Sequence, residues 1–150
     1  MTPKTKKNAW FVIFDHTADI GVNAFGPTAT AVFEQAARGM FDIIFHSSVP
    51  KITKKGEYEI KLQGKDLEQL MVDWLGELLF IYTTQHIVIA EYEINIEINK
   101  EFCLLDAHVY GETVPEKTLL KSCEIKAVTY HMLTVAETKD GWKTSVLFDI

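Results

Sequence analysis

The sequence predicts an α/β protein of the α+β kind, with a two-layer fold in which two helices pack on a largely antiparallel β-sheet. Two segments carry apolar residues at spacings of three and four, as amphipathic helices do. Several other segments alternate apolar and polar residues, as half-buried strands do. Short turn sequences join two pairs of these strands, which is typical of antiparallel neighbours.

Length and composition favour one folded unit. The chain has 150 residues, of which 47% are hydrophobic and 24% are charged, as in ordinary globular domains. We expect a disordered tail over residues 1–8 and a single domain over residues 9–150. The formal net charge of −6 disfavours direct, extensive binding to nucleic acid and to anionic membranes. No stretch is long and apolar enough for a membrane span or a secretory signal, so we expect a cytoplasmic protein.

The first half of the chain is expected to hold three strands and both helices. The strands are predicted over residues 10–14, 20–25 and 57–62. The polar segment between the first two strands, residues 15–19, is expected to form a loop. Thr28 is predicted to cap a helix that ends near residues 47–50, and Asp66, with Gln69 three residues later, resembles a capping box that opens the second helix.

The second half is expected to contain two hairpins. The first joins a strand from residue 87 to one over residues 102–110, and the second joins a long strand over residues 124–136 to a last strand over residues 142–148. His131 would lie on the less charged face of the long strand, where a core histidine is favoured over a ligand. Cys103 and Cys123 are interpreted as reduced, buried thiols rather than a disulfide, although a disulfide stays open.

No motif of covalent catalysis is found, since a glycine-rich phosphate loop, a nucleophile elbow and a paired-histidine zinc helix are all missing. Two acidic features remain. Asp15 and Asp19 could offer oxygens to a hard cation, or they could simply close a turn. At the other end, Asp149 stands beside the terminal carboxylate of Ile150. These two negative groups would repel each other unless solvent, a proton or a metal intervenes, although an exposed terminus is the simpler interpretation.

Five motifs in order across nearly the whole chain resemble the archease family. They are Asp15-His16-Thr17-Ala18-Asp19-Ile20-Gly21, Gly26-x-Thr28 before a helix with Phe33-Glu34, Leu70-x-x-Asp73-Trp74-Leu75-x-Glu77-Leu78-Leu79, Lys126-Ala127-Val128-Thr129-Tyr130-His131 and the final Asp149-Ile150. The resemblance implies an accessory protein, not an enzyme, that activates an RtcB-type RNA ligase. It would promote guanylylation and turnover of the ligase in tRNA splicing and RNA repair.

The resemblance also implies a divalent metal, calcium first, with magnesium or manganese possible. Its ligands would be Asp19, Asp149 and Ile150, with Asp15 and His16 as outer or alternative ligands. Two other functions stay open. One is a general chaperone or modulator of RNA-processing enzymes, which would need an exposed apolar patch. The other is a small metal-dependent hydrolase built on Asp15, His16 and Asp19.

Overall fold

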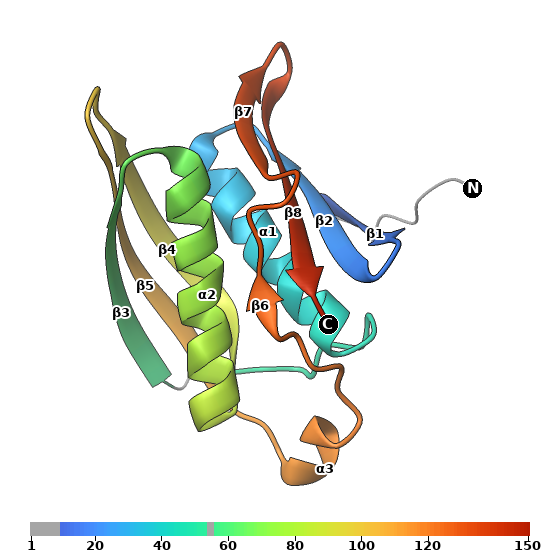
Figure 1. Ribbon diagram of the computed structural model, residues 1–150. Helices are drawn as coiled ribbons and strands as arrows, with labels where there is room; N and C mark the ends of the chain where they lie inside the picture. The colour runs from blue at the N-terminus through green and yellow to red at the C-terminus, as the bar shows by residue number, and fades with distance from the viewer. Residues whose placement is uncertain (1–9, 54–55) are drawn as a thin grey trace.

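A computed structural model describes residues 10–53 and 56–150, so the expected tail over residues 1–8 lies outside the described residues. Two long helices lie between two antiparallel sheets (Figure 1). None of the helices within these ranges has the length and apolar content needed to traverse a membrane. In chain order the elements are β1 (Phe11–His16), β2 (Asp19–Gly26), α1 (Ala29–Ile44), β3 (Gly56–Gly64), α2 (Leu67–Gln85), β4 (Ile87–Ile98), β5 (Cys103–Thr113), α3 (Glu116–Leu119), β6 (Ala127–Val128), β7 (Thr134–Thr138) and β8 (Gly141–Asp149).

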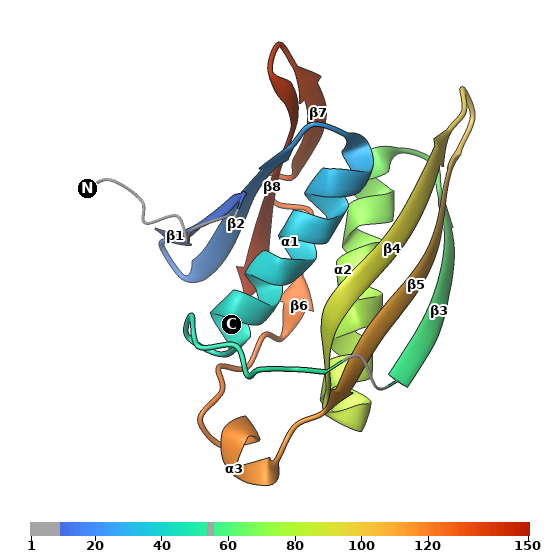
Figure 2. The ribbon, with the colours of Figure 1, turned by 180° about the vertical axis from the view of Figure 1, so that it is seen from behind.

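The strands divide into two sheets. One has the order β1-β2-β8-β6, with β7 also paired to β8, and the other has the order β3-β5-β4. Each long helix contacts strands of both sheets, and the view from behind shows α1 between β2 and β4 (Figure 2). The predicted class, helices with antiparallel strands, is confirmed. The expected single sheet and two layers are corrected to two sheets with the helices between them, because the broad buried side of each helix contacts strands of both sheets.

The two long helices begin where the sequence predicted. The Thr28 side chain accepts a hydrogen bond from the Ala31 N–H at 3.1 Å, and the Asp66 carboxylate accepts one from the Gln69 N–H at 2.8 Å. The Gln69 side chain reaches back to accept from the Lys65 N–H at 2.9 Å. The first two bonds satisfy amides that the first turn of a helix leaves without partners, and the third ties the residue before the cap to the helix.

The core joins the two helices directly. Trp74 of α2 is fully buried, and its indole N–H donates to the Phe33 carbonyl of α1 at 2.9 Å. Its ring also meets the ring of Tyr92 on β4, with centroids 6.2 Å apart. Burial raises the pKa of the Tyr92 phenol well above its usual value. Cys103 is buried and Cys123 is half-buried, and both are free thiols.

The long strand predicted over residues 124–136 is wrong. Pairing with β8 covers only Ala127 and Val128, and it resumes at Thr134 in β7. Between them the chain turns, with a hydrogen bond from the Leu133 N–H to the Tyr130 carbonyl at 3.2 Å and Met132 in the left-handed conformation at φ 54°. The short helix α3 was also not predicted.

Replacing Asp66 with alanine should lower the free energy of unfolding by about 1 kcal/mol, because the Gln69 amide loses its partner at the start of α2. Urea unfolding followed by circular dichroism measures this change. Glu68→Ala, in the same first turn, should cost less, about 0.3 kcal/mol through the helix dipole. An equal loss in both variants would show that the cap is not the cause.

Candidate functional site

The acidic segment near the start of the chain is a tight hairpin. Only Thr17 and Ala18 form the turn, while Asp15 and His16 end β1 and Asp19 begins β2. His16 pairs directly with Asp19. The prediction of a loop over residues 15–19 is therefore wrong. Two residues are enough to close a hairpin, so the strand pairing runs to its end.

The other acidic feature lies against this hairpin. Strand β8 pairs with β2 so that Asp149 is directly opposite Asp19. Directly opposite residues on neighbouring strands project from the same face of a sheet, so the two side chains share a face. The Asp149 carbonyl accepts a hydrogen bond from the Lys126 N–H at 2.7 Å, which ties this end of β8 to the chain next to β6. Ile150, 43% exposed, follows immediately.

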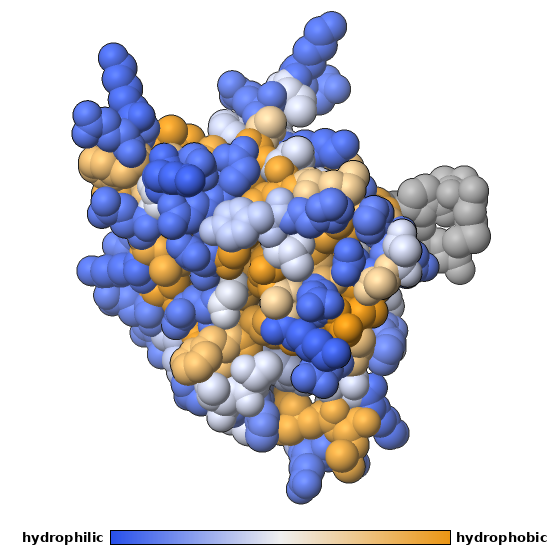
Figure 3. Space-filling view, in the orientation of Figure 1, coloured by the Kyte–Doolittle hydropathy of each residue, from blue (hydrophilic) through white to orange (hydrophobic). Residues whose placement is uncertain are grey.

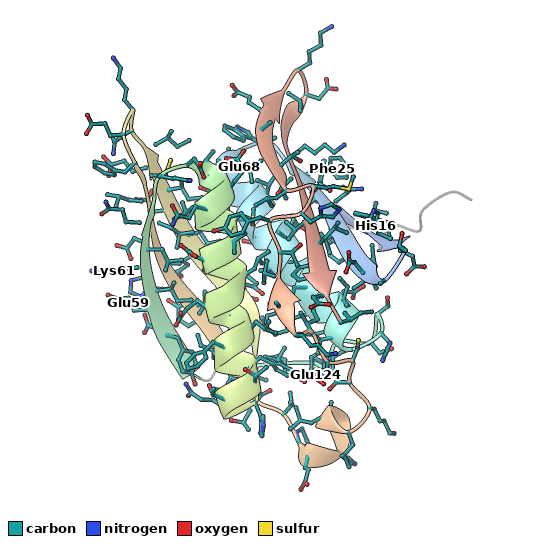
Figure 4. The ribbon with its side chains drawn as sticks, viewed as in Figure 1. His16, Phe25, Glu59, Lys61, Glu68 and Glu124 are labelled. Carbon is teal, nitrogen blue, oxygen red and sulfur yellow. The ribbon has the colours of Figure 1, made fainter. Side chains whose placement is uncertain are left out.

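His16, labelled in Figure 4, pairs with Asp19 and so shares this face. Its Nδ1 atom is 3.7 Å from the Asp19 Oδ2, which is too long for a hydrogen bond. The same Nδ1 is buried and has no hydrogen-bond partner within the described ranges. His16 therefore lies next to Asp19, one of the predicted metal ligands, but makes no hydrogen bond to it.

Asp15 is not brought to the acidic pair. It pairs with Ile20, one position along from the pairing of His16 with Asp19. Successive side chains of a strand point to opposite faces, so the Asp15 carboxylate belongs to the face opposite that of Asp19 and Asp149. Asp15 is exposed there.

His131 is a neighbour of the site that the sequence did not indicate. It was expected in the core, and this is wrong, since it is exposed in the turn between β6 and β7. Its ring lies 5.8 Å from the ring of His16, centroid to centroid. Thr129 holds this turn, because both its N–H and its hydroxyl donate to the Leu147 carbonyl at 3.0 Å. The apolar and polar alternation continues through the turn, so periodicity could not reveal it.

The chemistry of the pair suits a hard cation. Two carboxylates directly opposite each other repel, and neither forms an ion pair with lysine or arginine in the part of the chain that the structure describes. Calcium and magnesium prefer oxygen ligands of this kind. The described residues contain no group of three or more His, Cys, Asp or Glu side chains placed to hold a metal. A cation here would therefore need further oxygens, such as those of Ile150 or of water.

Comparisons with known proteins identify the family. The model of the archease protein family matches residues 11–150. The chain belongs to the archease family. It is 45% identical to protein archease of Methanosarcina barkeri over 138 residues, which cover 91% of this chain and 92% of that protein. It is 37% identical to protein archease of Pyrococcus furiosus over 139 residues, covering 91% and 96%.

A solved structure agrees with the archease fold. The solution structure of Methanobacterium thermoautotrophicum protein 1598 superposes with a TM-score of 0.79 at 32% identity, covering 95% of this chain and 99% of that one. The family model and the relatives confirm the resemblance drawn from the five motifs. Archeases are known as a family of accessory proteins. The acidic pair and Ile150 lie within the matched residues.

Asp149→Asn should stabilise the protein in a buffer that contains a strong chelator. The substitution removes one of two facing negative charges, a gain of about 0.2–1 kcal/mol in the free energy of unfolding. Urea unfolding in the presence of EDTA measures it. Asp15→Asn, on the opposite face of the same hairpin, is the matched control and should show a smaller change. Destabilisation by Asp149→Asn in EDTA would contradict the repulsion.

Proposed function

We propose that this archease holds a divalent cation, calcium first, with Asp19, Asp149 and the Ile150 carboxylate, and that it activates an RtcB-type RNA ligase. The observation that carries the proposal is the direct pairing of Asp19 with Asp149 across β2 and β8. This pairing joins two acidic features that were each unremarkable alone. Magnesium and manganese take similar oxygen ligands and are the alternative metals.

The acidic end of the β2–β8 pair is accessible to a partner. Asp149 and Ile150 are exposed, and so are Tyr130 and Met132 of the neighbouring turn. The ligase binds RNA and is expected to be basic around its active site, so an acidic surface would speed the encounter. A bound divalent cation would offset two of the three negative charges on Asp19, Asp149 and the Ile150 carboxylate, and would stabilise this end of the sheet. The archease would dock there while the ligase is guanylylated on its own histidine.

The residues around the pair would keep its geometry. The Lys126 N–H bond to the Asp149 carbonyl fixes the end of β8, and Thr129 fixes the Leu147 carbonyl two residues earlier. His16 contacts Asp19 from the side. Positioning by neighbouring groups of this kind commonly tunes metal ligands. Asp15 is left without a role in this proposal, since it belongs to the other face.

Two other functions are less well supported. A general chaperone would need an extended apolar patch. On the face in Figure 3, hydrophilic residues interrupt the hydrophobic areas. A hydrophobic protrusion lies at α3, next to which Leu120 is exposed. A hydrolase built on Asp15, His16 and Asp19 would need these side chains to converge, and alternation separates Asp15 from the other two.

Calcium should stabilise the unmodified chain against thermal unfolding. A ligand at one hundred times its dissociation constant adds about 2.7 kcal/mol when it binds only the folded state. Scanning calorimetry in EDTA and in excess calcium measures the effect. Asp19→Asn and Asp149→Asn should lose it, and Asp15→Asn should keep it. A chain that calcium does not stabilise, or an equal loss in Asp15→Asn, would refute the proposed ligand set.

Asp149→Ala should abolish stimulation of multiple-turnover RNA ligation by a purified RtcB-type ligase. Transfer of labelled GMP to the ligase histidine reports the step that the archease would promote. Asp106→Ala, on the exposed face of the other sheet, is the control and should stimulate as the unmodified chain does. Circular dichroism checks that both variants are folded. Full stimulation by Asp149→Ala, or stimulation that survives exhaustive chelation, would overturn the proposal.

A further inference from the structure

A cavity of about 530 Å³ lies at the far end of the β2–β8 pair from the acidic residues. In the register, Phe25 faces Lys143 and Gly26 faces Trp142 at this end, whereas Asp19 faces Asp149 at the other. Figure 4 shows Phe25 and His16 toward opposite ends of β2. The volume falls within the usual range of ligand pockets. We call it the aromatic cavity, and its main lining residues are Trp10, Phe25, Pro27, Asp140, Trp142 and Lys143.

Backbone contacts build this cavity. Gly141 has φ +135°, a conformation that side-chain-bearing residues rarely adopt, and a Cβ there would lie 2.5 Å from the Gly26 carbonyl. The β7–β8 turn can therefore approach the end of β2 closely, which brings Trp142 to the cavity. On the other side, the Phe25 N–H donates to the Trp10 carbonyl at 2.7 Å, and the Trp10 N–H donates to the side chain of Gln35 on α1 at 3.3 Å.

The two cavity tryptophans differ from the third tryptophan of the chain. The buried Trp74 donates its indole N–H to the Phe33 carbonyl. Within the described residues, neither Trp10 nor Trp142 donates its indole N–H to a partner, and Trp10 is 58% exposed. Two indole rings without a hydrogen-bond partner among the described residues thus line one cavity with Phe25 and Pro27. A ligand that offers carbonyl oxygens and apolar rings would satisfy both features.

The charges at the cavity do not favour a polyanion. Its lining holds one cation, Lys143, and one carboxylate, Asp140, and the Lys143 ammonium already lies 5.7 Å from the centroid of the Phe25 ring. RNA and DNA are bound chiefly through several lysine or arginine contacts to phosphate, which this lining lacks. A ligand of low charge is the better match. Proline-rich peptides are such ligands, and proteins hold them in grooves lined by aromatic rings.

We propose that the aromatic cavity binds a short proline-rich segment of a partner protein in the polyproline II conformation. The prolines pack against the rings of Trp10, Phe25 and Trp142, and the indole N–H groups donate to the peptide carbonyls. Polyproline II leaves its carbonyls without internal partners, so it loses little entropy and few hydrogen bonds on binding. The interaction is independent of the metal, because the acidic pair lies at the other end of the strands.

The three indole N–H signals of a ¹⁵N-labelled sample give a direct test. Titration with a ten-residue oligoproline should shift the signals of Trp10 and Trp142 and leave that of the buried Trp74 in place. Trp10→Ala should weaken binding at least about tenfold, as loss of an exposed aromatic anchor does. Trp142→Phe, which removes the indole donor and part of the aromatic surface but keeps a ring, should weaken it less. Phe80→Ala, at an equally exposed aromatic of α2, should bind as the unmodified chain does.

Three results would overturn the proposal. The first is that none of the indole signals moves at millimolar oligoproline. The second is that Trp10→Ala binds as tightly as the unmodified chain, which would place the peptide elsewhere. The third is that single-stranded U10 RNA shifts the same two signals at lower concentration than oligoproline, which would make the cavity a base-stacking site. Unchanged oligoproline binding by Asp149→Asn would support the independence of the two ends.

Discussion

The pairing of β8 with β2 is the constraint on which both ends of the larger sheet depend. β8 also pairs with β6 and β7, so it holds that sheet together. Val146 and Phe148 of β8 are completely buried on the core face. A slip of one residue would turn them out of the core, at a cost of up to about 1.5–3 kcal/mol for each side chain. The repulsion between Asp19 and Asp149 is smaller, at most about 1 kcal/mol, so burial fixes the register that holds the acids together.

The same alternation decides which acidic residues can act as a unit. A site on strands can use only every second residue of each strand. His16 and Asp19 share the face of Asp149, while Asp15 falls on the other face with Ile20. The segment at residues 15–19 reads as a cluster of polar groups in the sequence. In the sheet it contributes one carboxylate and one imidazole to the candidate site.

The sequence was most informative where a contact is local. Thr28 and Asp66 cap helices through bonds to amides three residues away, and the sequence shows both partners. It was least informative where the partner is distant. The break after Val128 depends on the hydrogen bonds of Thr129 to Leu147, and the left-handed turn at Met132 has no glycine to mark it. The alternation of apolar and polar residues reveals neither the Thr129 hydrogen bonds nor the turn at Met132, so it predicts a continuous strand.

The candidate site needed information of yet another kind. Spacing alone left Asp19 and Asp149 as two separate features with simpler interpretations, since nothing in the periodicity says that the last strand lies beside the second. The family resemblance joined them, and the β2–β8 register provides the geometry. The aromatic cavity had no such help, because Trp10 and Trp142 come from distant segments and match no motif. Only the folded structure shows that these residues line one cavity.

The two ends of the β2–β8 pair offer a partner different chemistry at a fixed separation. From the pair Asp19 and Asp149 to the pair Phe25 and Lys143 is six residues along the strand, or about 20 Å at the usual rise of an antiparallel strand. A partner that contacts only the acidic end binds through charge and metal, and salt weakens the charge contribution. A partner that also carries a proline-rich segment gains a second, salt-tolerant contact. That second contact is intramolecular, so a weak peptide affinity is enough to prolong a transient encounter.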